Sequence, residues 1–150
     1  MTLKGLPTLD KKTMQLIGLT RYQMNTLKIS ELAKHGITVI NKETELFSEI
    51  TTLQARKLEL SNSKLFLLEK ISIKNEILAT ERKKQKPNFR KINRIQKEVD
   101  TLNARIRSYG NELSDIDAAL NNYEITLRQL AKGHEFISMV LEERARLGRY

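Results

Sequence analysis

The sequence contains no cysteine and no tryptophan, only two prolines and six glycines, and aromatic residues make up only 5% of it. The lack of cysteine excludes a disulfide framework and any thiolate metal site or nucleophile, and it is compatible with a reducing cytosol. The scarcity of aromatic residues argues against a large pocket lined by aromatic side chains. Few residues interrupt helices, so long helices are expected.

Long hydrophobic runs are also missing. The longest apolar stretches span only a few residues, as at residues 65–68, so no segment is long enough to cross a bilayer. Residues 1–7 lack an apolar run of signal-peptide length, and no lipidation motif is visible at either end. We therefore expect a cytoplasmic protein.

The composition fits helices that bury a narrow seam. Apolar residues make up 39% of the 150 residues and charged residues 30%. This chain is too apolar to be disordered and too highly charged to build a thick globular core. The net charge of +9 indicates an acidic partner, depending on where the charge lies.

Apolar residues recur at alternating intervals of three and four in the C-terminal half, which predicts one helix over residues 89–147. The a positions are Ile92, Val99, Ile106, Leu113, Leu120, Leu127, His134 and Leu141. The d positions are Ile95, Leu102, Tyr109, Ile116, Tyr123, Leu130 and Ile137. Gly110 and Gly133 lie inside this helix, where each costs about 1 kcal/mol relative to alanine.

A second long helix is predicted over residues 41–84, with Asn41 as its N-cap and with lysines 57, 64 and 74 among its seam positions. Pro87 breaks the helical pattern, Asn88 can cap the next helix, and residues 83–88 form a turn. If the chain folds back there, residues whose numbers add to about 173 face each other. The resulting layers are Leu78–Ile95, Ile71–Leu102, Leu67–Ile106, Leu60–Leu113, Leu53–Leu120 and Leu46–Leu127. A domain-swapped dimer with a straightened turn would use the same layers.

The expected fold class is therefore all-α, a long antiparallel two-helix coiled-coil hairpin at 41–150 preceded by an N-terminal helix and connector at 1–40. The shorter helix is expected at 10–35, capped by Asp10 and ended by Gly36. It is expected to cover the last turns of the 89–147 helix, which overhang the 41–84 helix.

Positive charge is concentrated at the predicted turn, and no acidic residue lies between Arg82 and Lys97. The basic residues of this window are Arg82, Lys83, Lys84, Lys86, Arg90, Lys91, Arg94 and Lys97. Such a basic tip suits an acidic protein surface, nucleic-acid phosphates or anionic lipid. The alternative is a solvated turn that only keeps the protein soluble. Phe89 alone offers a ring for base stacking, which favours a protein partner over nucleic acid.

A weak second apolar stripe lies on the 41–84 helix, at Phe47, Leu58, Leu65 and Leu68. It must meet the N-terminal helix, another protein or a second copy of the chain, so homodimerisation is one expectation. Neither histidine, His35 or His134, has a second ligand at metal-binding spacing. No phosphate loop, nucleophile elbow or carboxylate pair is present, so we expect no enzyme, no metal and no cofactor.

In length and hairpin architecture, the expected protein resembles the coiled-coil stalk proteins of flagellar and type III secretion export ATPases, although the helix at 10–35 departs from that pattern. Coiled-coil subunits of tethering and kinetochore complexes share the same architecture. This resemblance implies a non-enzymatic adaptor, stalk or spacer subunit in a larger protein assembly. The alternatives are a nucleic-acid-binding helical hairpin and a self-assembling structural coiled-coil dimer.

Overall fold

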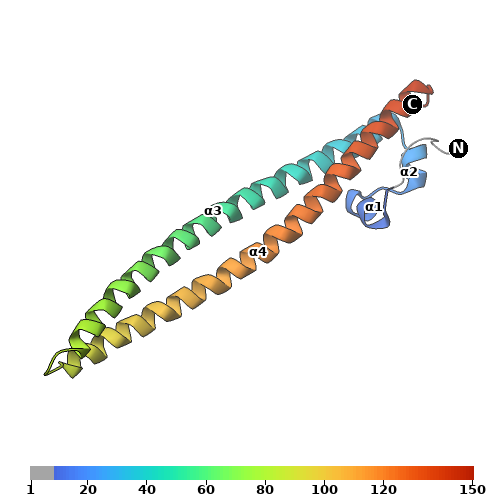
Figure 1. Ribbon diagram of the computed structural model, residues 1–150. Coiled ribbons are helices and arrows are strands. Elements are labelled where there is room, and N and C mark those ends of the chain that lie inside the picture. Colours follow the sequence, from blue (N-terminus) through green and yellow to red (C-terminus); the bar gives the residue numbers. More distant parts are fainter. Residues whose placement is uncertain (1–8) are drawn as a thin grey trace. The chain divides into compact units, whose positions relative to one another are not determined.

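The computed structural model describes residues 9–150, so the first eight residues of the predicted N-terminal segment lie outside the described residues. Over the described range the chain forms the helices α1 (Lys11–Ile17), α2 (Arg21–Thr26), α3 (Ile29–Arg82) and α4 (Phe89–Arg146), without a strand (Figure 1). α3 and α4 are antiparallel and pack against each other, which confirms the predicted all-α hairpin. No helix within residues 9–150 combines the length and hydrophobicity needed to cross a membrane.

The chain forms two compact units. The hairpin unit is Thr52–Leu120, which holds the second half of α3, the turn and the first half of α4. The terminal unit comprises the described residues up to Thr51 together with Asn121–Tyr150, and it holds α1, α2 and the remaining parts of the two long helices.

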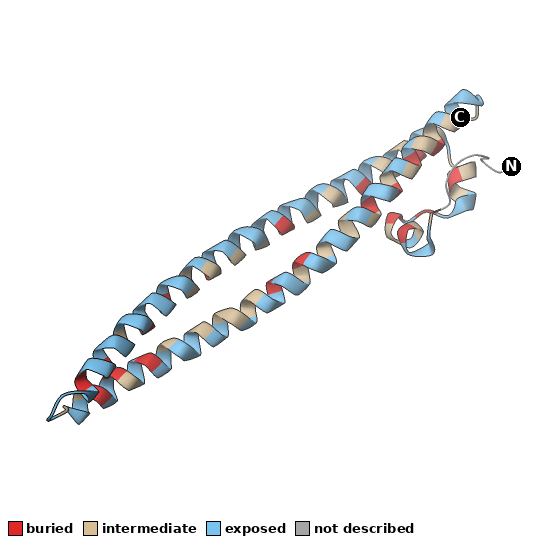
Figure 2. Ribbon diagram, in the orientation of Figure 1, coloured by how far each residue is buried: buried red, intermediate tan, exposed pale blue. Residues whose placement is uncertain are grey.

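The hairpin unit is held together by a narrow apolar seam between α3 and α4 (Figure 2). Its buried cluster near the turn consists of Ile71, Leu78, Ile92, Ile95 and Val99, with Leu102 and Ile106 packed against it. The members come from the predicted seam positions of both helices. Side chains at these positions bury their apolar area against the partner helix, and this packing stabilises helices that expose most of their remaining surface.

Ion pairs across the hairpin confirm the predicted register. Lys57 Nζ lies 2.6 Å from Asp117 Oδ1, and Lys74 Nζ lies 2.6 Å from Glu98 Oε2. The residue numbers in these pairs add to 174 and 172, close to the predicted 173. Both lysines occupy seam positions, and each directs its ammonium group to a carboxylate on α4. Two of the seam lysines therefore bind the opposite helix.

The predicted helix boundary at residues 36–41 is wrong, because α3 begins at Ile29 and runs through Gly36 and Asn41 without interruption. The register continues beyond the predicted start. A Cβ added to Gly36 would lie 3.4 Å from the Ile137 side chain, and His134 Nδ1 lies 2.9 Å from Glu43 Oε1. The end of α4 therefore packs against α3 itself. This packing outweighs the weak helix propensity of glycine.

The single helix predicted at 10–35 is also wrong, since this segment forms α1, α2 and the start of α3. Gly18 ends α1 with φ 73°, a left-handed conformation that glycine adopts without steric cost. Thr20 then begins α2 in a capping box, in which its hydroxyl accepts from the Gln23 N–H and the Gln23 side chain accepts from the Thr20 N–H. Asp10 does precede α1, where its carboxylate accepts a hydrogen bond from the Thr13 hydroxyl.

The terminal unit has the larger buried cluster, and Gly133 lets α1 approach α4 within it. The cluster consists of Ile17, Leu19, Met24, Leu32, Val39, Leu130, Ile137 and Val140. A Cβ placed on Gly133 would lie 2.4 Å from Cγ2 of Ile17, well inside van der Waals contact. The absence of a side chain at Gly133 therefore creates the space that the buried Ile17 occupies.

Arg144 links the end of α4 to α2. Its guanidinium is buried and donates to the backbone carbonyls of Met24 and Arg149. The N–H of Ile29, the first residue of α3, donates to the carbonyl of Tyr150. The Met24 carbonyl and the Ile29 N–H lie at helix ends, where they have no partner within their own helix, and the carbonyls of Arg149 and Tyr150 lie beyond the end of α4.

Candidate partner-binding site at the hairpin tip

The predicted turn forms between the end of α3 at Arg82 and the start of α4 at Phe89. Asn88 caps α4 as predicted, because its side-chain oxygen accepts from the Lys91 N–H at 3.2 Å. The N–H of Lys84 bonds the carbonyl of Glu81 at 3.2 Å. Residues 83–88 therefore close the hairpin in a short connection fixed at both ends.

Glu81 joins the two sides of the turn and was missed as a site residue from the sequence. The residue is only 4% exposed. Its carboxylate accepts hydrogen bonds from the Asn88 N–H at 3.0 Å and from Lys84 Nζ at 2.8 Å. Lys91 Nζ lies 3.7 Å from the same carboxylate. These interactions, led by the Lys84 hydrogen bond, lower the pKa of the Glu81 carboxyl and outweigh the opposing effect of desolvation. The carboxylate therefore stays ionised and anchors two tip lysines.

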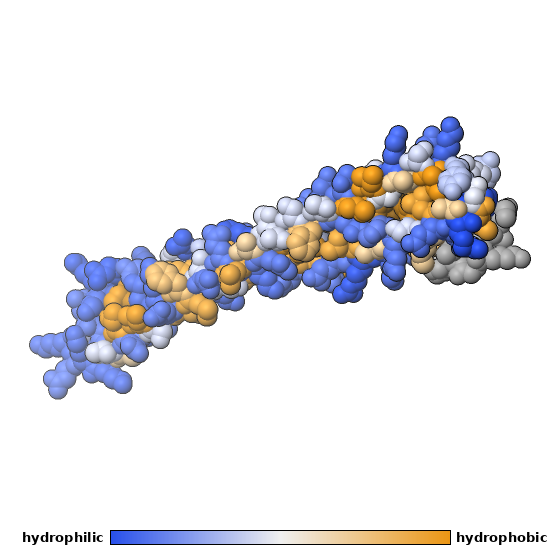
Figure 3. Space-filling model, turned by 90° about the horizontal axis from the view of Figure 1, so that it is seen from above, coloured by the Kyte–Doolittle hydropathy of each residue, from blue (hydrophilic) through white to orange (hydrophobic). Residues whose placement is uncertain are grey.

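The predicted basic residues fall into three groups with different surroundings. Lys84 and Lys91 bind Glu81, and Arg82 donates to the side-chain oxygen of Gln96 at 3.3 Å. Lys83, Lys86 and Arg90 are exposed and have no carboxylate within ion-pair distance in the described chain. Arg94 and Lys97 lie further along α4. Figure 3 shows the hydrophilic tip and, behind it, hydrophobic side chains exposed between hydrophilic ones.

Arg94 and Lys97 line a shallow hollow of about 450 Å³ beside the seam, together with Lys70 and Lys74 of α3, which are not among the predicted residues of the basic tip. We call this hollow the side groove. Its lining residues are Lys70, Lys74, Arg94, Lys97, Glu98, Thr101 and Leu102. Lys74 binds Glu98, and this hydrogen bond is the largest cause of a lowered pKa of the Glu98 carboxyl. The positive charges of Lys70, Arg94 and Lys97 are therefore not balanced within the groove.

The second apolar stripe is exposed at every predicted position. Phe47 is 63% exposed in the terminal unit, and Leu58 and Leu65 are 64% and 65% exposed in the hairpin unit, where Leu68 is also exposed. None of these side chains belongs to either buried cluster. α1 and α2 therefore do not bury Phe47, and the three leucines form an exposed row on α3.

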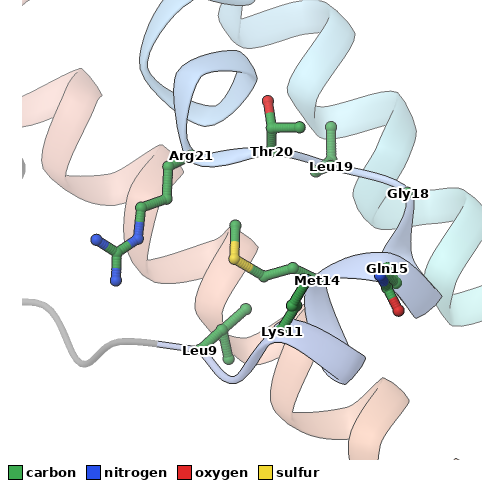
Figure 4. Close-up of a pocket in the computed structure, with 8 residues that line it drawn as sticks. All are labelled: Leu9, Lys11, Met14, Gln15, Gly18, Leu19, Thr20 and Arg21. Atoms are coloured by element: carbon green, nitrogen blue, oxygen red, sulfur yellow. The ribbon is translucent and has the colours of Figure 1, made fainter.

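The terminal unit contains a separate hollow of about 450 Å³ between α1 and the segment leading to α2 (Figure 4). Leu9, Met14 and Leu19 supply its apolar lining, and Lys11 and Arg21 lie at its edge, with the Arg21 guanidinium directed outward. Within residues 9–150, no three His, Asp or Glu side chains are grouped closely enough to hold a metal ion. Among the same residues, the carboxylate that pairs with His134 is that of Glu43.

Comparison with known proteins does not assign this chain to a group: no protein family, no curated protein and no solved structure matches it.

Proposed function

We propose that this protein is a non-enzymatic coiled-coil interaction protein, an adaptor, stalk or spacer subunit of a larger cytoplasmic assembly, whose basic hairpin tip contacts an acidic partner protein. The observation that supports this proposal is the surplus of cations at the tip. Lys84 and Lys91 bind Glu81 and fix the turn, whereas Lys83, Lys86 and Arg90 take no part in fixing it.

Like charges close together repel each other and oppose compact folding, so a tip that only needed to be closed and solvated would gain from interspersed acids. The nearest acid is instead Glu81, which is buried and already bound to lysine. A cluster of unpaired cations attracts an acidic surface from a distance and raises the rate of association.

The test is capture of partners from native lysate on immobilised protein, quantified by mass spectrometry. The tip variant carries Lys83→Glu, Lys86→Glu and Arg90→Glu. A charge-matched control variant reverses three exposed cations of the terminal unit, Lys34, Lys42 and Arg128. We expect an acidic protein to be captured by the wild type and the control and lost with the tip variant. Equal capture by all three proteins would refute a role for the tip.

Nucleic acid is the alternative ligand for the tip, because Phe89 is 69% exposed next to Arg90 and offers one stacking surface. A gel shift at low salt with the same variants separates the two ligands. Binding of RNA or DNA that is lost with the tip variant, but unchanged in the control, would replace the acidic protein as the partner.

Self-association is a second candidate function, favoured by the exposed row on α3. Leu58 and Leu65 are seven residues apart, which places them on one face of the helix. Sedimentation of the Leu58→Glu, Leu65→Glu variant tests it. The matched control places glutamate at Ala104 and Asn111, exposed positions seven residues apart on α4. A dimer that dissociates only in the leucine variant would support the homodimer, and an unchanged mass would reject this interface.

A further inference from the structure

Exposed apolar side chains of α3 lie next to the side groove. Lys70 Nζ lies 4.7 Å from the centre of the Phe66 ring, and Phe66 is itself exposed. Ile73 and Ile77 follow Lys70 at intervals of three and seven residues, which places them on the same side of the helix. Ile73 is 52% exposed and Ile77 is exposed as well.

The floor of the side groove is also partly apolar. Leu102 lines it and is packed against the buried cluster of the hairpin unit, so the groove opens directly onto the seam. Lys70 and Lys74 come from α3, and Arg94 and Lys97 come from α4. The surface thus combines an apolar strip on one helix with cations on both sides of a shallow hollow.

We propose that the side groove, with the apolar strip of Phe66, Ile73 and Ile77 beside it, is the docking site for an acidic amphipathic helix of the partner protein. This inference rests on the proposed function and deepens it, because it assigns the partner's binding element and its position on the hairpin. A helix with leucines on one face and glutamates along its borders matches both halves of the surface.

Charge complementarity favours this occupant over the other ligands of a basic surface. The groove holds four cations and one carboxylate, and Lys74 already neutralises that carboxylate. Nucleic-acid phosphates would contact the cations, but they would not bury the exposed side chains of Ile73 and Ile77. The Phe66 ring beside them already carries Lys70 on its face. A flat lipid bilayer would contact the exposed cations but would leave the hollow between the two helices unfilled. An acidic amphipathic helix uses both the charge and the apolar area.

The experiment measures binding of a synthetic peptide to the full-length protein by fluorescence anisotropy. The probe is a helix of about 20 residues, roughly 30 Å long, with leucines at intervals of three and four and glutamates elsewhere. A peptide of identical composition and scrambled order is the control ligand. We expect the amphipathic peptide to bind at least about tenfold more tightly than the scrambled one, which corresponds to about 1.4 kcal/mol.

Two groove variants address the two halves of the surface separately. Arg94→Glu with Lys97→Glu removes the positive charge, and Ile73→Ser with Ile77→Ser removes the apolar strip. Each is expected to weaken peptide binding at least about tenfold, with helicity by circular dichroism unchanged because all four side chains are exposed. The Arg94→Gln, Lys97→Gln variant removes the charge without reversing it, and it is expected to weaken binding in the same direction.

The outcomes distinguish this inference from the proposed function. If peptide affinity is insensitive to both groove variants, or if scrambled and amphipathic peptides bind equally, the docking site is refuted. Lysate capture that depends on the tip would still stand. Binding of duplex DNA, single-stranded RNA or phosphatidylserine vesicles that is lost with Arg94→Glu, Lys97→Glu, in the absence of peptide binding, would also overturn it. If no charge reversal affects peptide or lysate binding, both proposals fail.

Discussion

Gly110 and Gly133 both lie inside α4, yet a methyl group added at these two positions meets very different surroundings. At Gly110 nothing lies within 4 Å of the added atom, whereas at Gly133 it would stand 2.4 Å from Cγ2 of Ile17. At an interior helical position, alanine is more stable than glycine by about 1 kcal/mol. Gly110→Ala should therefore stabilise the hairpin unit by about that amount.

Gly133→Ala gains the same helix propensity but must displace a buried side chain. A normal contact between two methyl carbons is about 3.5–4 Å, so the overlap exceeds 1 Å. Ile17 is 3% exposed and β-branched, so it cannot rotate into free space. Overpacking of this kind costs about 1–3 kcal/mol. Because the propensity gain is common to both variants, Gly133→Ala should be less stable than Gly110→Ala by about 1–3 kcal/mol.

Urea unfolding followed by circular dichroism at 222 nm measures both free energies. If the two units unfold in separate transitions, each variant is judged in the transition of its own unit. The Ile17→Ala background isolates the cause, since it removes Cγ2 at a cost of about 2–5 kcal/mol for the truncated core residue. In that background Gly133→Ala should recover its gain of about 1 kcal/mol. A Gly133→Ala protein as stable as Gly110→Ala would refute the close packing of α1 on α4.

Three further predictions concern polar contacts. Glu81→Gln should lower the melting temperature at pH 7. Because folding lowers the pKa of the Glu81 carboxyl, its ionised form stabilises the fold above about pH 4.5, and this stabilisation is lost as the pH falls further. The melting temperatures of the wild type and the variant should therefore converge in acid. Arg144→Met should destabilise the terminal unit by about 1–3 kcal/mol, because the Met24 carbonyl loses its buried donor, and limited proteolysis should then cut near α2 sooner. Lys57→Glu should cost up to about 1 kcal/mol in urea unfolding, with recovery in the Lys57→Glu, Asp117→Lys protein; no recovery would mean that this exposed pair contributes nothing.

The hairpin could be predicted from the sequence because one periodic pattern determines it. α4 begins at Phe89 and ends at Arg146, within one residue of the predicted span. The register follows from the turn at Pro87 and the heptads, and it agrees with the Lys74–Glu98 pair. Where hydrophobic spacing is regular and a proline marks the break, local and long-range preferences favour the same structure.

The start of α3 could not be predicted from local signals, because tertiary packing decides it. Glycine and asparagine, as at Gly36 and Asn41, are common at helix boundaries. The free energy that these residues cost inside a helix is smaller than the stabilisation gained by burying Val39 and Leu32 in the cluster of the terminal unit. The break at Gly18 did have a readable signal, since Thr20 and Gln23 form a capping-box sequence two residues later.

The basic site was only partly predictable, because chain order hides which cations lie together. Glu81 was overlooked since it precedes the basic window by one residue, although its spacing of three from Leu78 continues the seam. Lys70 and Arg94 line the same groove, and the sequence shows this only when α3 and α4 are aligned in their hairpin register. Neighbouring residues in a hairpin are those whose numbers have a constant sum, so a run of charge in the sequence is an incomplete description of a charged surface.

The two long helices differ in what they expose, and this difference bears on which helix meets a partner. In the hairpin unit, α4 exposes one large apolar side chain, at its first residue. In the same unit, the large apolar residues that α3 exposes are Leu58, Leu65, Phe66, Leu68, Ile73 and Ile77. A helix that serves only to complete a two-helix seam needs a single apolar stripe. Additional exposed apolar side chains in rows promote aggregation unless another surface covers them. Because the rows on α3 flank the seam on both sides, while α4 presents a polar exterior, binding partners are expected to contact α3 and to use α4 for its charge.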